Sequence, residues 1–196
     1  MGLRGWLGLV GTSVLLSACT VSVEGEGVPA NSTATTLSML PLPFVPKYSG
    51  RTNERNNGTR FEPCTAYTDE EMRALGADPG SIEDVMISES PNYRGCQWRS
   101  PDRVAYFGQT LGNEKSLDVY KAKQSYRPWQ PDRVINGRRV ILTTEDRDGC
   151  FASFMSEGAI VHSAYSIGTR GKPSSDLVAE CNKAIEWATL AISKAP

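Results

Sequence analysis

The chain contains very little histidine: His162 is the only one among its 196 residues. A serine triad would have to use it as the base, yet no serine near it has the sequence context of a nucleophile. The Gly-x-Ser-x-Gly, Ser-x-x-Lys, His-Glu-x-x-His, Cys-x-x-Cys and Walker motifs are also missing. We therefore expect a structural or surface histidine and predict no catalytic residues, which disfavours an enzyme without excluding one.

Metal-ligand spacing is missing as well. No two cysteines lie within four residues of each other, as the common zinc motifs require, so we predict no metal and no cofactor. Asp146 and Asp148 flank Arg147 and could bind calcium or act as a carboxylate pair, but an ordinary hairpin turn explains them more simply. Arg94, Arg99 and Arg103 could bind an anion, although charges that protect strand edges are the simpler interpretation.

Neither sign of charge dominates. The chain has 21 Lys and Arg against 22 Asp and Glu, for a net charge of −1. This balance gives no electrostatic reason to expect nucleic acid as a partner or a polybasic patch for membranes. Beyond the first residues, no apolar run approaches the roughly 18 residues that a membrane-spanning helix needs.

The N-terminal segment is typical of an export signal. An apolar run from Trp6 to Leu16 follows Arg4 and is too short to span a bilayer comfortably. It ends in Leu16-Ser17-Ala18-Cys19, which resembles the bacterial lipobox. We therefore predict a lipoprotein signal peptide at residues 1–18 and lipidation of Cys19 with acyl chains such as palmitate. Two or three such chains would anchor the protein stably to a membrane.

Residues 19–60 are predicted to be the lipidated cysteine and a flexible tether. This stretch is rich in Gly, Pro, Ser and Thr and shows neither helical nor strand periodicity. Residues 39–48 are more apolar than a spacer needs, which leaves open whether they pack on the domain; the proline content favours a loose spacer.

The remaining four cysteines, Cys64, Cys96, Cys150 and Cys181, are an even number and fit an oxidising compartment. Three pairings are possible. We favour Cys64–Cys96 and Cys150–Cys181, because each closes a loop of about 30 residues.

Residues 61–196 are predicted to form one globular domain. Thr68-Asp69-Glu70-Glu71 has the pattern of a capping box that starts a helix ending at Gly76. Asn136-Gly137 indicates a two-residue hairpin within an antiparallel meander. The expected helices cover residues 69–75, 114–123 and about 175–194, and the expected strands cover 94–99, 103–111, 133–135, 138–144, 150–155 and 159–167. This order predicts an α+β fold: an antiparallel sheet with helices, including a C-terminal one, packed on one face.

Aromatic residues are the remaining candidates for binding. Tyr126 and Trp129 lie in a proline-bounded connection and could rim an apolar pocket or a partner site, although packing in the core is favoured.

Several of these features together resemble a family of actinobacterial secreted lipoproteins of unknown function. They are the lipobox, Pro63-Cys64-Thr65 with the helix after it, and Gly95-Cys96-Gln97-Trp98, within a similarity that covers about Phe61 to Ile192. The resemblance implies a cell-envelope location and supports two disulfides, and it supplies no catalytic residues.

We accordingly expect a lipid-anchored protein on the extracytoplasmic face of the cell membrane. Its role would be that of a non-enzymatic binding or accessory module for an envelope lipid, glycan or protein. The alternative is an envelope hydrolase or transferase with an unrecognised active site.

Overall fold

A computed structural model describes residues 40–85, 91–144, 149–167 and 176–196. These residues belong to one compact unit, Ser38–Pro196. The predicted signal peptide, Cys19 and the first part of the predicted tether lie outside the described residues, as do Asp146 and Asp148.

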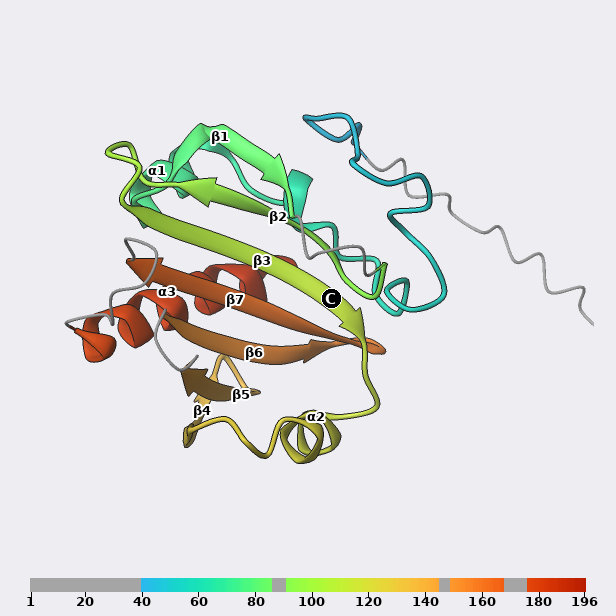
Figure 1. The fold of residues 1–196 in the computed structure, drawn as a ribbon, viewed down its shortest axis with the longest axis vertical. Coiled ribbons are helices and arrows are strands. Elements are labelled where there is room, and N and C mark those ends of the chain that lie inside the picture. Colours follow the sequence, from blue (N-terminus) through green and yellow to red (C-terminus); the bar gives the residue numbers. More distant parts are fainter. Residues whose placement is uncertain (1–39, 86–90, 145–148, 168–175) are drawn as a thin grey trace, which may run out of the picture. The chain divides into compact units, whose positions relative to one another are not determined.

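The unit is built on one seven-stranded sheet in the order β1-β2-β3-β7-β6-β5-β4 (Figure 1). All paired strands are antiparallel. The strands are β1 (Asp78–Asp84), β2 (Arg94–Arg99), β3 (Ala105–Asn113), β4 (Trp129–Ile135), β5 (Arg138–Thr144), β6 (Cys150–Ser156) and β7 (Ala159–Ile167). The predicted α+β class with an antiparallel sheet and a C-terminal helix is confirmed.

Local sequence signals account for several elements. The capping box of α1 (Asp69–Leu75) is present: the Thr68 side chain accepts from the Glu71 amide and the Glu71 carboxylate from the Thr68 amide. Asn136 and Gly137, at φ 48° and 78°, form the β4–β5 hairpin as predicted. The C-terminal helix α3 (Leu177–Lys194) begins at an Asp176 N-cap. Residue 175, near which this helix was predicted to begin, lies outside the described residues.

The helices divide between the two faces of the sheet, which corrects the prediction that they share one. The core of α3 packs against Val140 and Leu142 of β5, and α1 shares a core cluster with Trp187 of α3. On α2 (Leu117–Lys123), Leu117 packs instead against Ile141 and Ile160. These isoleucines alternate with the α3-facing residues of their strands, so α2 lies on the opposite face.

Trp187 fixes α3 to the sheet. Its side chain is fully buried, and its indole nitrogen donates to the Gly108 carbonyl of β3 at 2.9 Å. Tyr67 and Trp98 pack against it with ring centroids at 4.8 and 5.5 Å. Such aromatic contacts contribute packing energy beyond the buried area.

Both edge strands differ from the sequence prediction. The sequence predicts no strand before residue 94 and places Trp129 in a connection, but Pro79 and Gly80 lie in β1 and Trp129 lies in β4. The pairing of each edge strand with its neighbour is interrupted by an irregularity. Proline is tolerated there because an edge strand leaves some amides unpaired.

The folded unit also begins earlier than the expected boundary at residue 61. Asn56 is completely buried, Thr59 is nearly so, and the Arg94 guanidinium donates to the carbonyls of Asn56, Thr59 and Phe61. Further upstream, Leu42 and Phe44 pack on the core cluster around Trp187. The core clusters of the described residues and both disulfides therefore lie within Ser38–Pro196, so this unit holds what it needs to fold by itself.

The favoured disulfides are both present. Cys64 pairs with Cys96, and Cys150 of β6 pairs with Cys181 of α3, at Cα separations of 5.6 and 4.9 Å. The first bridge joins the segment before α1 to β2, and the second joins α3 to the sheet.

The double variant Cys150→Ala/Cys181→Ala should remain folded but lose about 3.5 kcal/mol of unfolding free energy, because the bridge closes a 31-residue span in the unfolded chain. Urea unfolding followed by tryptophan fluorescence measures the loss. The wild type should fall to the same stability when reduced at this bridge, and equal stability with and without the bridge would contradict the prediction.

Candidate functional site

The two aromatic residues predicted to bind a ligand, Tyr126 and Trp129, line neither of the two pockets described below. Tyr126 is 71% exposed, and its hydroxyl donates to Gln124. Trp129 is half-buried, packs edge-on against Tyr120 at 6.1 Å and donates its indole N–H to the Gln124 carbonyl. Trp129 therefore belongs to the packing of α2 on the sheet, and a binding role for either residue stays a prediction.

The three candidate anion-binding arginines, Arg94, Arg99 and Arg103, each make different contacts. Arg94 is buried and forms an ion pair with Glu62. The Arg99 guanidinium lies over the Tyr106 ring, 3.7 Å from its centroid. Arg103 adopts a left-handed backbone conformation at the turn before β3. Their roles in the structure are those of packing and turn formation.

Arg94 belongs to a buried charge cluster with Glu62, Arg51 and Asp84. Glu62 accepts from both arginines, and Arg51 also reaches Asp84 at 3.3 Å. Two positive and two negative side chains thus neutralise one another, as buried charges require. The cluster fastens residues 51–62 to β2, so its role is structural.

Glu62 also lies close to the sulfur atoms of Cys64 and Cys96, a grouping that could suggest a metal site. Metals bind cysteine as the thiolate, and these two sulfurs are joined in a disulfide. The Glu62 carboxylate is already engaged by Arg51 and Arg94. The donor set does not fit a metal ion.

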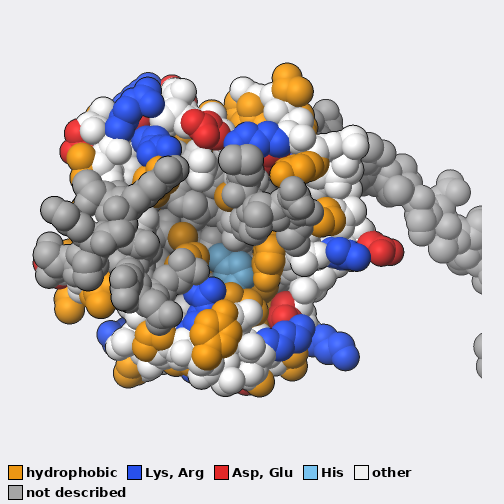
Figure 2. Space-filling view, viewed as in Figure 1, with side chains coloured by type: hydrophobic (Ala, Val, Ile, Leu, Met, Phe, Trp, Pro, Cys, Tyr) orange, Lys and Arg blue, Asp and Glu red, His pale blue; other side chains and the backbone are white. Residues whose placement is uncertain are grey.

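His162 lies on the face of the sheet opposite α3. Figure 2 shows the single histidine, in pale blue, at the bottom of a hollow. Its Nδ1 is 2.7 Å from the hydroxyl of Ser153 on β6, and its buried Nε2 has no hydrogen-bond partner in the part of the chain that the structure describes. The rings of Tyr120 and Tyr93 pack against it at 4.8 and 6.0 Å.

The environment of His162 opposes a role as a general base. Burial, and secondarily the positive charge of Arg127, lowers its pKa from 6.5 to about 3. In a serine triad, the imidazole nitrogen opposite the serine would contact a carboxylate. Among the described residues no carboxylate reaches Nε2, and Ser153 is almost completely buried. The hydrogen bond between His162 and Ser153 therefore fits a structural role for the histidine.

A polar pocket of about 300 Å³ lies near His162, beside Tyr93 and Tyr120. Its charged side chains each have a partner within the protein. Lys123 pairs with Glu114 at 2.8 Å, and Arg55 donates to the neutral side chain of Asn92 at 2.9 Å. The Arg55 charge is therefore hydrogen-bonded without being neutralised, and most of the lining residues are polar.

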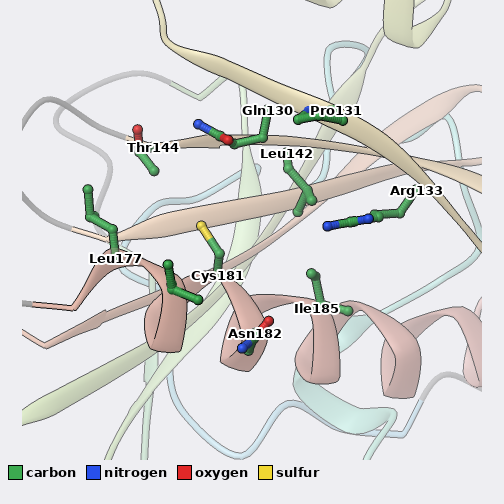
Figure 3. Close-up of a pocket in the computed structure, with 10 residues that line it drawn as sticks. Gln130, Pro131, Arg133, Leu142, Thr144, Leu177, Cys181, Asn182 and Ile185 are labelled. Atoms are coloured by element: carbon green, nitrogen blue, oxygen red, sulfur yellow. The ribbon is translucent and has the colours of Figure 1, made fainter.

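A second pocket, of about 260 Å³, lies on the other face, between α3 and the strands β4 and β5. We call it the α3 pocket. Most of its lining is apolar, and Figure 3 shows side chains from the helix and from the sheet turned toward one another. Its apolar lining residues are Pro131, Leu142, Leu177, Val178, Cys181 and Ile185.

Among the described residues that line the α3 pocket, Arg133 is the one charged side chain. The other polar lining residues are Gln130, Thr144 and Asn182. Arg133 extends from β4 into the space between Leu142 and Ile185 (Figure 3). An apolar pocket with one oriented charge has the composition of a small-molecule site, so the α3 pocket is the best candidate functional site.

Sequence reasoning missed this pocket and the part played by Arg133. The residue was assigned to a strand, but its direction depends on the irregular pairing of β4 with β5 between Gln130 and Arg133. The helical stripe that includes Cys181 and Ile185 was the available signal, because it placed these side chains against the sheet.

Acid should weaken the fold through His162. Its pKa is lower in the folded state than the unfolded value of about 6.5, so its contribution to stability is complete above that pH and is lost as the pH falls toward 3. Between about pH 7 and pH 5 the wild type should lose about 2 kcal/mol of unfolding free energy from this group alone. In His162→Asn this component should vanish, as urea unfolding at both pH values can measure.

Ser153→Ala is the matched control for that comparison, because it removes the hydrogen bond but keeps a buried imidazole. Its acid-dependent loss should resemble that of the wild type. An identical loss in His162→Asn and wild type would show that the histidine is not neutral and buried.

Within the described residues, no helix combines the length and apolar character that crossing a bilayer requires. Comparison with curated proteins and with solved structures found no match. A family model described as "Protein of unknown function (DUF3558)" matches residues 14–194. That match covers most of the chain, and the protein belongs to the DUF3558 family.

Proposed function

We propose that this protein is a lipoprotein of the cell envelope, anchored through Cys19, whose domain binds a ligand or partner outside the cytoplasmic membrane. The observation that carries the anchor is the order of the first residues: Arg4, the apolar run Trp6–Leu16, then Ser17-Ala18-Cys19. The envelope of an actinobacterium is the setting that the family resemblance suggests.

The cysteines support an exported address. The four cysteines of the folded unit form two disulfides, and such bonds persist mainly in oxidising compartments. Cys19 is the remaining cysteine of five. Because the other four cysteines pair with one another, alkylation of the Cys19 thiol by a diacylglyceryl group would account for the odd cysteine.

The α3 pocket supports binding as the activity. Its lining is mostly apolar and includes the Arg133 guanidinium, which has no ion-pair partner among the described residues. The buried charge cluster around Glu62, by contrast, is neutralised internally. A groove of this kind can hold a ligand without any group placed for proton transfer or nucleophilic attack.

An envelope hydrolase or transferase is the second candidate, and the hydrogen-bonded Ser153–His162 pair favours it. A working pair would need a titratable base and an accessible hydroxyl. The lowered pKa of His162 and the burial of Ser153 both weigh against that function. Binding therefore remains the preferred proposal.

The anchor can be tested with Cys19→Ser in the full chain. Metabolic labelling with a radioactive or alkyne-tagged palmitate should mark the wild type, and the label should be lost in the variant because serine lacks the thiol that is alkylated. The variant should also be lost from the lipid-anchored fraction recovered by detergent phase partitioning.

Cys64→Ala/Cys96→Ala serves as the control, since it removes two other cysteines and leaves Cys19 in place. It should be labelled as strongly as the wild type. Undiminished labelling of Cys19→Ser would rule out this anchor.

A further inference from the structure

The α3 pocket contains a charge, that of Arg133, with no counterpart among the described residues. In that part of the chain the Arg133 side chain forms no hydrogen bond or ion pair, and the pocket lining includes no carboxylate. The neighbouring acid, Asp132, is engaged elsewhere, with Lys121 at 3.0 Å and Arg139 at 2.7 Å. An anion entering the pocket would therefore meet a guanidinium that no carboxylate of the described residues already occupies.

The walls of the pocket suit a hydrocarbon chain. Leu142 and Ile185 flank the Arg133 side chain, and the lining continues past Cys181 to Leu177 at the start of α3 (Figure 3). Leu177 and Val178 are 42% and 73% exposed, which is unusual for large aliphatic side chains at one site. The pocket thus has a charged end and an apolar end.

The protein holds these walls in place before any ligand arrives. The Cys150–Cys181 disulfide ties the pocket side of α3 to β6, and Leu142 belongs to the main core cluster. A pocket whose walls are already ordered loses little conformational entropy on binding. This rigidity favours recognition of a small ligand over docking of a large surface.

We propose that the α3 pocket binds a single-chain fatty acid, with its carboxylate on Arg133 and its hydrocarbon chain running past Cys181 toward Leu177. This inference rests on the proposed function and names the ligand class for it. A guanidinium matches a carboxylate with two parallel hydrogen bonds. The volume of about 260 Å³ is small for a ligand pocket and suits one chain rather than two.

The single positive charge of Arg133 also decides which head group the ligand carries. A neutral amphiphile would leave the guanidinium without an acceptor, and a phosphate carries more charge than one arginine neutralises. Acyl chains of the protein's own anchor would be ester- or amide-linked and would bring no carboxylate. The free carboxylate is therefore the group that the pocket selects.

The test is isothermal titration calorimetry of the Ser38–Pro196 unit with dodecanoate below its critical micelle concentration. One molecule should bind per protein. Octanoate should bind more weakly, by roughly fourfold for each methylene that no longer enters the pocket. Dodecanol and dodecyl phosphate test the head group, and both should bind more weakly than dodecanoate.

Two variants locate the site. Arg133→Gln should weaken dodecanoate binding at least about tenfold and leave dodecanol binding unchanged. Asn182→Trp, which places an indole at an exposed lining position of α3, should block both ligands. Arg73→Gln removes the same charge from an exposed side chain of α1 that is not part of the pocket lining, and this variant should bind dodecanoate like the wild type.

Circular dichroism and urea unfolding should show Arg133→Gln and Asn182→Trp to be as folded as Arg73→Gln. Absence of dodecanoate binding by the wild type, or equal binding by wild type and Arg133→Gln, would overturn the inference. Stronger binding of dodecyl phosphate would overturn the choice of head group. None of these results affects labelling at Cys19, so the proposed anchor is judged separately.

Discussion

The pairing of β3 with β7 is the interaction on which the rest of the structure depends. It runs from Ala105–Ile167 to Asn113–Ala159 and joins the N-terminal strands to the C-terminal meander. Without it, β1-β2-β3 and β7-β6-β5-β4 would be two small sheets with open edges. Helix α3 packs mainly on β6 and β7, yet its Trp187 donates to Gly108 of β3, so the helix covers this junction. Every site described above lies on a sheet that this pairing holds together.

The sequence predicted those parts of the fold that depend on residues adjacent in the chain. The capping box at Thr68 and the hairpin at Asn136-Gly137 each rest on a few consecutive residues, and both are present. The β3–β7 pairing rests on contacts between distant segments, which no local pattern encodes. The edge strands β1 and β4 were missed or shortened because Pro79 and Pro131 are turn signals that an edge position overrides. Burial of Asn56 was missed because its partner, Arg94, lies 38 residues further along the chain.

The disulfides, His162 and the α3 pocket differ in the same way, according to whether sequence spacing or tertiary packing determines them. The disulfide pairs were predicted because loop length alone favoured them. The hydrogen bond of His162 to Ser153 depends on the register of β6 with β7, and the α3 pocket depends on how α3 lies across β5. Composition could identify Tyr126 and Trp129 as aromatic, but only the packing of α2 showed that Trp129 contacts Tyr120.

Arginines occur in two different settings in this molecule, and the contrast between them indicates what Arg133 can bind. Where an arginine is buried, as Arg94 is, a carboxylate and several carbonyls surround it, because an uncompensated buried charge costs several kcal/mol. Arg133 avoids that cost by remaining exposed to water while it projects along an apolar wall. An exposed guanidinium stays hydrated until an anion displaces the water around it. The apolar surface beside Arg133 additionally stabilises an anion that carries a hydrocarbon chain. The combination discriminates against simple salts and against neutral lipids alike, since each satisfies only one half of the pocket.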